Sequence, residues 1–440
     1  MLKVAKFGGS SMADAGQYQK IRDIIRSDPS RRVVVVSAAG KRSAGDNKIT
    51  DLLYLCYAHL QYGVSCDGIY QMIRERYGDI HRELGLRVDL EGVLDRLRSQ
   101  MEQGISRDEL VSRGEYLSAL LMADYLGFTF VDAAQWLFFH YDGTIDQEKS
   151  YAALRALARD KCVVIPGFYG LMPDGKLRTL TRGGSDITGA LAAAALDADV
   201  YENWTDVSGF FMADPRIVKN AKKIDCITYK ELRELSYMGA SVLHEDSIFP
   251  VQKGGIPINV KNTNDPEHPG TMILAEPEDD HGCITGIAGK KGFTIIHLEK
   301  DKMNSELGFG RRVLSVFEEL GISFEHLPTG IDTLSVVISD KQLNGHKEEV
   351  VRRLREVCSP DRIEVVSNLA LIATVGHGMV RRVGIAAMLF TALAEAGVNV
   401  RMIDQGSSEI NIIAGVESDD FEVALRAIYA CFENEEEWIE

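Results

Sequence analysis

The chain has 440 residues and a formal net charge of −16, and its contents of 45% apolar and 26% charged residues are those of an ordinary globular protein. The negative charge argues against a surface for nucleic acid or anionic membrane, because both require a basic face. The seven cysteines are scattered without a C-x-x-C pair, and no long apolar segment opens the chain, which argues against a zinc site, a disulfide framework and secretion. We therefore expect reduced thiols and a cytoplasmic protein of two or three domains.

Strand-like and helix-like segments alternate along the first part of the chain. In chain order, the apolar patterns predict a strand at 2–7, a helix at 17–27, a strand at 32–37, helices at 49–59 and 108–125, strands at 128–132 and 162–166, a helix at 187–196, and strands at 199–204 and 257–261. The charged stretch 62–103 is helical in character, and the sequence assigns it no role. The alternation predicts a mostly parallel sheet with helices on both faces, which binds ligands at the carboxyl ends of its strands.

A boundary and then a repeat follow this region. Turn-rich acidic segments at 264–270 and 276–280 are typical of a linker. Beyond them a pattern recurs at a constant offset of 76 residues, in the pairs Gly308 and Gly384, Gly321 and Gly397, and Leu334 and Ile410. Each copy predicts strand, helix, strand, strand, helix, strand, which is the ferredoxin-like plan. We predict domains at 1–275, 284–367 and 368–440, with part of 284–291 free to pair with the last.

Residues Lys6-Phe7-Gly8-Gly9-Ser10-Ser11, here called the first glycine loop, follow directly on the first predicted strand. Glycines allow backbone N–H groups to approach an anion, and a helix start adds free donors and partial positive charge. The lysine adds a full charge. The loop therefore favours a phosphate site, and the alternative is a strand followed by an ordinary helix turn.

Residues Thr181-Arg182-Gly183-Gly184-Ser185-Asp186, the second glycine loop, precede the predicted helix at 187–196. Ser185 or Asp186 is expected to cap this helix, and Arg182 can hold a carboxylate through two hydrogen bonds. The alternative is a well-capped helix with a solvated arginine. Two adjacent glycines before a capped helix favour the anion site.

Two further polar motifs carry weaker signals. Trp204-Thr205-Asp206 ends a predicted strand, and Asp214-Pro215-Arg216 follows, so a nucleotide site and an ordinary capped turn both remain open. Glu115, in Arg113-Gly114-Glu115, lies on an otherwise apolar helix. A buried glutamate needs a partner, which is either a ligand ammonium or an internal salt bridge.

These motifs occur together, in this order, in the aspartate kinases, and the chain resembles that family over essentially its whole length. The tandem C-terminal repeat resembles the family's paired ACT domains, which bind amino-acid effectors, and Gln405–Asn411 is typical of the second one. The resemblance implies an amino-acid kinase fold followed by two βαββαβ ACT domains. It also implies the reaction of ATP with L-aspartate to 4-phospho-L-aspartate and ADP, the first step toward lysine, threonine and methionine.

The resemblance implies a role for each matching residue. Lys6, oriented by Asp186, contacts the transferred phosphoryl group together with the backbone of Gly8 and Gly9. The residues implied to hold aspartate are Thr50, Glu115, Arg182, Gly183, Gly184 and Ser185. Those implied to hold ATP are Lys6, Ser10, Thr205, Asp206, Phe211, Arg216, Lys261 and Asn262.

The sequence departs from the family at four positions in or next to these motifs. Ser10 replaces a common threonine and keeps the hydroxyl, and Thr181 replaces a usual glycine before Arg182. Ser208 replaces a frequent aspartate, which argues against a metal or ribose role at that position, and no residue is assigned as a metal ligand. Phe211 replaces a tyrosine, which removes a hydrogen bond.

The expected nucleophile is the side-chain carboxylate of aspartate. Its pKa near 3.9 leaves it ionised at neutral pH, so no general base is required and Glu115 is assigned to the substrate ammonium. Catalysis then consists of positioning and charge neutralisation, with Mg²⁺ bound alongside ATP. We expect Arg182→Ala to raise mainly the KM for aspartate.

The repeat predicts feedback control, because effectors in this family bind between such units. The residues predicted to bind the effector are Met303, Ser305, Gly308, Ser323, Phe324 and Glu325. Glu325 can meet a side-chain ammonium, which favours lysine over threonine as the effector. Pairing of the repeats between chains predicts at least a homodimer.

Two competing hypotheses remain. Another kinase of this fold would phosphorylate glutamate, acetylglutamate or a nucleoside monophosphate, and the paired repeats argue against it. A non-catalytic amino-acid sensor would have no need of Lys6. No dinucleotide fingerprint follows the repeats, so we expect no fused homoserine dehydrogenase.

Overall fold

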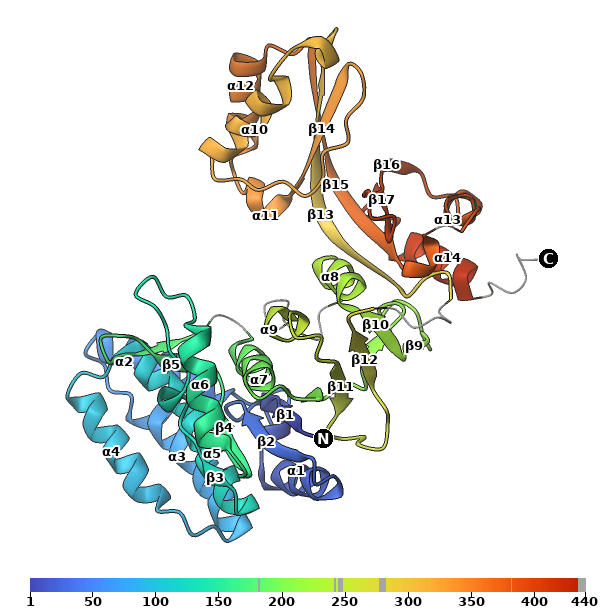
Figure 1. Cartoon of the computed structure of the whole chain (residues 1–440). Coiled ribbons are helices and arrows are strands. Elements are labelled where there is room, and N and C mark those ends of the chain that lie inside the picture. Colours follow the sequence, from blue (N-terminus) through green and yellow to red (C-terminus); the bar gives the residue numbers. More distant parts are fainter. Residues whose placement is uncertain (181–182, 241–242, 244–247, 277–281, 381, 434–440) are drawn as a thin grey trace. The chain divides into compact units, whose positions relative to one another are not determined.

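The computed structural model describes residues 1–180, 183–240, 243, 248–276, 282–380 and 382–433 (Figure 1). The chain forms two compact units, and each is described by itself. The first consists of Met1–Phe210, Asp225–Tyr229 and Val242–Pro277, and the second of Phe211–Ile224, Lys230–Ser241 and Glu278–Glu440. The domain limits predicted at 275 and 367 stay predictions, since the chain passes between the compact units more than once.

An eight-stranded sheet forms the centre of the first unit, in the order β10-β12-β11-β7-β1-β2-β4-β3. Its strands are β1 (Lys3–Phe7), β2 (Arg31–Val36), β3 (Thr129–Phe130), β4 (Val163–Pro166), β7 (Val200–Thr205), β10 (Cys226–Thr228), β11 (Ile258–Asn262) and β12 (Thr271–Leu274). All neighbours are parallel except β11 and β12. The predicted mostly parallel sheet is therefore confirmed.

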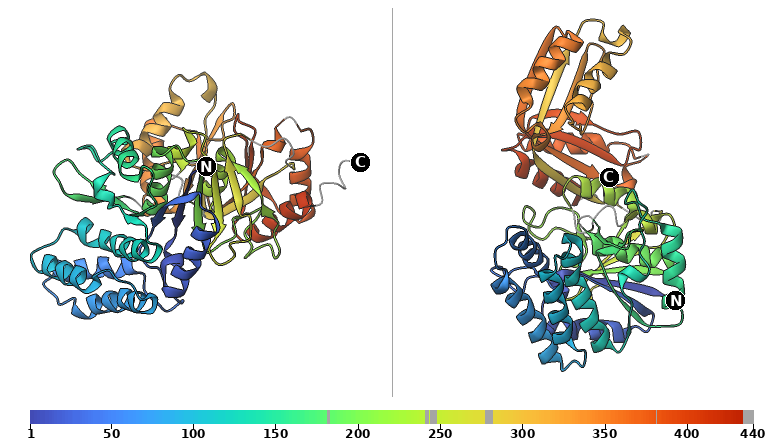
Figure 2. Two further views of the ribbon diagram at one scale, coloured as in Figure 1. Left: turned by 60° about the horizontal axis from the view of Figure 1, so that its bottom comes forward. Right: turned by 90° about the vertical axis from the view of Figure 1, so that its left-hand side faces the viewer.

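Helices cover both faces of this sheet. They are α1 (Ala15–Ser27), α2 (Ile49–Gln61), α3 (Asp67–Leu84), α4 (Leu90–Glu102), α5 (Arg107–Leu126), α6 (Gln147–Ala158), α7 (Gly184–Ala195) and α9 (Ile248–Gln252), with short 3₁₀ turns η1 (Gly9–Met12) and η2 (Ala133–Gln135). The side chains of Ala5 and Phe7 share one core with α1, α2 and α5, whereas α7 covers the face of Lys6. Helices α3 and α4 continue the layer of α2 and α5, in blue and cyan in Figure 2.

Residues 264–270 do not form the predicted linker. They connect β11 to β12, which pair antiparallel in the first unit's sheet. Gly270 has a φ of +79°, and a Cβ there would lie 2.0 Å from the carbonyl oxygen of Val260. The turn-rich composition therefore serves a tight connection between strands, and most of the second acidic segment, 277–280, lies outside the described residues.

A five-stranded antiparallel sheet forms the centre of the second unit, in the order β14-β13-β15-β17-β16. Its strands are β13 (Gly286–Glu299), β14 (Thr333–Ser339), β15 (Arg362–Val375), β16 (Val400–Asp404) and β17 (Asn411–Glu417). The long β13 and β15 run side by side in Figure 1. The first half of β13 pairs with the half of β15 that belongs to the second repeat, so the repeats share one sheet.

Two hydrophobic cores in the second unit correspond to the two repeats. The helices of this unit are α8 (Tyr229–Tyr237), α10 (Phe309–Glu319), α11 (Asp340–Leu343), α12 (Lys347–Cys358), α13 (Ile385–Glu395) and α14 (Phe421–Glu433), with 3₁₀ turns η4 (Met303–Ser305) and η5 (His377–Met379). The two repeats differ in one predicted strand. In the first repeat, the segment after Gly321 makes only isolated bridges, at His326 and Thr329, where the second repeat forms β16.

Short paired strands complete the structure. These are β5 (Tyr169–Leu171) with β6 (Leu177–Thr179), and β8 (Phe210–Phe211) with β9 (Lys223–Ile224). All seven cysteines are free thiols, as the sequence predicts. Within the described ranges, no helix combines the length and apolar character needed to cross a membrane.

Candidate active site

Lys6 occupies the centre of the sheet, on the middle strand β1, with its side chain only 8% exposed. Its ammonium forms an ion pair with the carboxylate of Asp186, in the first turn of α7. A Cβ added at Gly8 would lie 3.6 Å from the Lys6 Nζ atom. The ammonium of Lys6 therefore lies close to the glycines of the first glycine loop, at the carboxyl end of β1.

The second glycine loop leads into α7 earlier than predicted. The helix begins at Gly184, and its N-cap is Gly183, which has a φ of +77° and no side-chain capping bond. The expectation that Ser185 or Asp186 caps the helix is therefore wrong. A left-handed glycine starts the helix three residues early, which brings Asp186 into the first turn, where its carboxylate reaches Lys6.

The backbone of the first glycine loop is partly engaged. The N–H of Gly8 donates to the carbonyl of Trp204 at 3.0 Å, so this amide is not available to a phosphate, contrary to expectation. The N–H groups of Gly9 and Ser10 open η1 and have no acceptor within that helix. These two amides remain the candidates for an anion.

The first glycine loop rests on the loop that follows β2. The N–H of Gly40 donates to the carbonyl of Gly9 at 2.8 Å, and a Cβ at Gly40 would lie 2.5 Å from the carbonyl carbon of Gly9. Sequence patterns did not single out Gly40, because its role depends on a contact with a loop from another strand. The two loops can meet at this distance only when residue 40 is glycine.

We expect Gly40→Ala to displace the first glycine loop. Overpacking against a backbone that cannot yield typically costs about 1–3 kcal/mol, and the displaced loop should lower kcat by at least about tenfold. Thermal melting and initial rates measure the two effects. Gly45→Ala is the matched control, because nothing lies within 4 Å of its added Cβ; equal behaviour of the two variants would contradict the role of Gly40.

Glu115 is a buried carboxyl group that could bind a cation. It lies on α5 and is buried, and its Oε2 atom has no hydrogen-bond partner. Burial raises the pKa of this carboxyl to about 8, against hydrogen bonds from the backbone of Ala38 and of Glu115 itself. Among the described residues Glu115 has no ion pair, so the internal salt bridge, the alternative left open by the sequence, is not found there.

The residues around Glu115 are held close by small side chains. A Cβ at Gly114 would lie 2.8 Å from the Cβ of Ala38, which allows α5 to pack against the loop after β2. Thr50 is half-buried in the first turn of α2, whose first N–H, that of Ile49, donates to the carbonyl of Ala39. Thr50 and Glu115 thus both lie on helices that contact this loop.

The predicted nucleotide residues of β7 and β11 meet at the carboxyl ends of these strands. Asn262 pairs with Thr205 in the parallel register, and its amide donates to the Ser208 hydroxyl at 3.0 Å. Asp206 follows with an exposed carboxylate, and Ser10 is half-buried in η1. The polar groups that a nucleotide could contact here are the side chains of Ser10, Thr205, Asp206 and Asn262.

Lys261 lies on the other face of the sheet from Lys6. Its register partner is Trp204, whose ring lies 5.3 Å below its ammonium, whereas Lys6 pairs with Asn203 on the opposite face. Burial lowers the pKa of Lys261. Lys261 therefore reaches the carboxyl end of the sheet from the side of the Trp204 ring.

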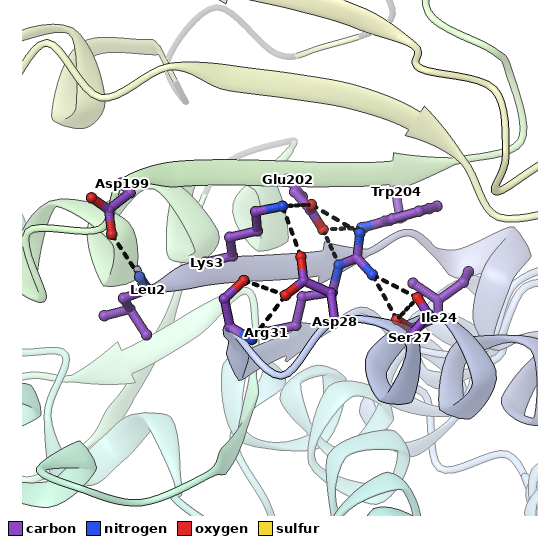
Figure 3. Close-up of polar contacts among 10 residues, drawn as sticks. Leu2, Lys3, Ile24, Ser27, Asp28, Arg31, Asp199, Glu202 and Trp204 are labelled. Carbon is purple, nitrogen blue, oxygen red and sulfur yellow. Dashed lines mark hydrogen bonds and ion pairs between the residues drawn. The ribbon is translucent and has the colours of Figure 1, made fainter.

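A buried ionic cluster supports Trp204 from below (Figure 3). Arg31 donates to both carboxylate oxygens of Glu202, at 2.7 and 3.1 Å, and the indole of Trp204 donates to the same carboxylate at 2.9 Å. Lys3 also contacts Glu202 and pairs with Asp28 at 2.8 Å. These bonds join β1, β2 and β7 and fix the strands whose ends carry the site.

Three of the predicted site residues lie outside the described part of the first unit. Arg182 lies outside the described residues, as does Thr181. Phe211 and Arg216 belong to the second unit, where Phe211 packs against the hydrophobic core of the second repeat and Arg216 pairs with Asp214 at 2.6 Å.

The predicted effector residues divide into two groups. Met303 and Gly308 line a pocket before α10, together with Glu306, Phe309, Leu327 and Thr329 among others. Ser305, Ser323 and Phe324 are exposed and do not line this pocket. Glu325 also lies outside it and accepts a hydrogen bond from the Tyr237 hydroxyl of α8.

Two families match the sequence. The amino acid kinase family matches residues 1–262, and the ACT domain family matches residues 372–432. Aspartokinase 3 of Bacillus subtilis is 39% identical to the chain, with 98% of each sequence covered.

Solved structures agree over the whole chain. The aspartate kinase of Clostridium acetobutylicum, described as an allosteric enzyme, matches at 51% identity and a TM-score of 0.91, covering 98% of this chain and 99% of the other. Aspartokinase III of Escherichia coli in complex with aspartate and ADP matches at 28% identity and a TM-score of 0.76, with 99% and 100% covered. Its complex with lysine and aspartate matches at 30% identity and a TM-score of 0.74, with 98% and 99% covered.

Proposed function

This chain belongs to the aspartokinase family, and from that membership we propose that it transfers the γ-phosphoryl group of ATP to the side-chain carboxylate of L-aspartate. The observation that carries the proposal is the buried Lys6–Asp186 ion pair, which joins the two glycine loops at the carboxyl end of β1. A buried cation at the end of a central parallel strand is suited to a highly charged phosphoryl group.

In the proposed mechanism, the carboxylate of aspartate attacks without a general base, because it is ionised at neutral pH. Glu115 binds the substrate ammonium, and the amides of Gly9 and Ser10 face the phosphates. As the substrate carboxylate approaches the γ-phosphate, the ammonium of Lys6 moves from Asp186 to the phosphoryl group and neutralises part of the negative charge. The second glycine loop, including Arg182, Gly183, Gly184 and Ser185, holds the substrate carboxylates beside the N-terminus of α7.

The nucleotide would lie along Ser10, Thr205, Asp206 and Asn262. Lys261 is proposed to complete this part of the site, and the roles that the resemblance implies for Phe211 and Arg216 stay predictions. Within the described ranges, no group of three or more His, Cys, Asp or Glu side chains could hold a metal. We propose that Mg²⁺ arrives on the phosphates of ATP, where it would need at most one or two protein carboxylates and would neutralise phosphate charge.

The release of ADP from Mg-ATP tests this function, with L-aspartate as acceptor and L-glutamate as control. We expect turnover that depends on aspartate and is far lower with glutamate. Turnover with glutamate, acetylglutamate or a nucleoside monophosphate instead would identify another kinase of the same fold. ATP binding without turnover would favour the amino-acid sensor.

We also propose that lysine is the feedback effector and that it binds in the region of Met303, Gly308 and Glu325. The complex of Escherichia coli aspartokinase III with lysine supports an effector of this kind. Glu325 does not line the pocket formed by Met303 and Gly308. We therefore propose that the effector site is completed by a second chain in a homodimer. We also propose that the protein is cytoplasmic.

Substitution of Glu325 should separate regulation from catalysis. A charge-assisted hydrogen bond contributes about 1.5–3 kcal/mol, so we expect Glu325→Gln to raise the half-inhibitory lysine concentration by at least about tenfold. The basal kcat should be unchanged. Activity titrations with lysine and threonine measure the effect, and Glu348→Gln, an exposed change on α12, is the control. Equal lysine sensitivity of both variants would contradict the assignment of Glu325.

A further inference from the structure

Asn203 is a buried polar residue in the active-site sheet that none of the sequence motifs assigned. It lies on β7, only 3% exposed, in direct register with Lys6 of the parallel strand β1. Register partners in a sheet project to the same face. Asn203 therefore shares the face, and the immediate surroundings, of the proposed phosphoryl-binding lysine.

Asn203 and Lys6 converge on the same atom. The amide of Asn203 donates to Oδ1 of Asp186 at 2.9 Å, and this is also the oxygen that pairs with the Lys6 ammonium. A carboxylate oxygen that accepts two donors shares its negative charge between them. The pull of Asp186 on Lys6 is thus weaker than it would be without the amide.

We propose that Asn203 is a positioning residue for Lys6, an inference that rests on the proposed kinase function. By binding the shared oxygen of Asp186, Asn203 fixes that carboxylate and keeps it hydrogen-bonded when Lys6 turns toward the phosphoryl group. If the amide were removed, the departure of Lys6 would leave the largely buried Asp186 carboxylate without either donor. Burying a charge without hydrogen bonds costs free energy. Lys6 would then stay bound to Asp186 and contribute less to the transition state.

A separate contact fixes the helix that carries Asp186. The hydroxyl of Tyr201, also on β7, donates to the backbone carbonyl of Asp186 at 3.0 Å. A Cβ at Gly189 would lie 2.6 Å from that hydroxyl, so α7 lies directly against Tyr201. The Asn203 side chain also interacts with the Tyr201 hydroxyl, but the bond from this hydroxyl goes to the backbone of Asp186 and not to its carboxylate. Substitution of Asn203 should therefore change mainly the hydrogen bonding of the Asp186 carboxylate.

The first test is Asn203→Leu, which removes the amide with little change in volume. Loss of a hydrogen bond to a charged group predicts a kcat lower by about tenfold or more. The KM for aspartate should change by less than about twofold, since Asn203 does not contact the substrate site at Glu115. The control is Asn259→Leu on the adjacent β11, whose register partner, Glu202, lies on the other face of the sheet.

The second test is Asn203→Asp, in which we expect the loss of kcat to depend on pH. Among the described residues, the ionisable groups around this position are Lys6, Asp186 and Tyr201. At low pH a protonated Asp at 203 can donate to Asp186 as the amide does, whereas at high pH its carboxylate competes for Lys6. We expect kcat at saturating substrates to approach that of the unsubstituted enzyme at low pH and to fall as the pH rises.

In both tests, the kcat of each variant is divided by the kcat of the unsubstituted enzyme in the same assay. An unchanged kcat in Asn203→Leu, or a loss in Asn203→Asp that is the same at every pH, would overturn the inference. A parallel loss of kcat in Asn259→Leu would mean that the sheet is merely destabilised, which also overturns it. Failure of the proposed function would appear differently, as an unsubstituted enzyme without aspartate-dependent turnover.

Discussion

Lys6→Ala is expected to lower kcat by at least about 10²-fold while the protein stays folded. A preorganised charged group aimed at developing charge is typically worth on the order of 10²–10³ in rate, and Lys6 is the buried cation at the end of the central strand. The KM for aspartate should change much less, because Glu115 and the second glycine loop are the groups proposed to hold that substrate. Steady-state rates with varied aspartate and ATP separate these effects.

A second variant distinguishes the lost charge from a cavity. Lys6→Met keeps most of the buried stem and removes only the ammonium, so it should lose as much kcat as Lys6→Ala with a smaller loss of thermal stability. Lys20→Ala, on the exposed surface of α1, is the control for loss of a lysine. Near-normal turnover in either Lys6 variant would refute the mechanism.

Glu115→Gln is expected to raise the KM for aspartate by roughly 10–100-fold, the value of one hydrogen bond between charged groups. In the ligand-free enzyme, burial raises the pKa of Glu115 to about 8. The proposed binding of the substrate ammonium by Glu115 requires the ionised carboxylate, so below pH 8 the carboxyl group must first lose its proton. The KM of the unsubstituted enzyme should therefore fall as the pH rises toward 8, by up to about tenfold per unit.

The KM of Glu115→Gln should not follow this pH dependence, since glutamine does not titrate. Kinetics between pH 6 and 9 measure the difference, with Glu83→Gln, an exposed change on α3, as control. A KM with the same pH dependence in Glu115→Gln as in the unsubstituted enzyme would exclude Glu115 as the group that binds the ammonium.

The raised pKa of Glu115 also predicts how the stability of the protein depends on pH. The folded-state pKa of Glu115, about 8, is raised above its ordinary value of 4.5. Between these pH values the folded chain keeps a proton that the unfolded chain has released, so the free energy of unfolding decreases as the pH rises through this window. Glu115→Gln should match the unsubstituted protein near pH 4 and be the more stable one at pH 9, as measured by thermal melting without substrate.

Local patterns predicted most of the elements of the first unit. The apolar runs placed β1, β2, β4, β7 and β11 within one or two residues, because a buried parallel strand is a short continuous apolar segment between turn residues. The start of α7 was predicted three residues late. Capping side chains were expected there, whereas the chain enters the helix through Gly183 in the left-handed region.

The C-terminal repeat illustrates the limits of local patterns. The constant offset of 76 residues predicted two similar units, and two hydrophobic cores are found. The isolated bridges of the first repeat could not be distinguished from a strand, because strand formation depends on the partner that pairs with it. The sharing of β13 and β15 between the repeats likewise depends on pairing between segments far apart in sequence.

The sequence by itself determined the residue types of the site and the family, because glycine loops, Lys6, Glu115 and Asp186 are chemical identities that need no coordinates. The tertiary structure alone decided which of these groups have partners. Sheet order brings β7 beside β1, and only then do Asn203 and Lys6 meet at Asp186, while Glu115 is left without an ion pair among the described residues. Strand order and register arise from contacts between distant segments, and such contacts leave no local pattern in the chain.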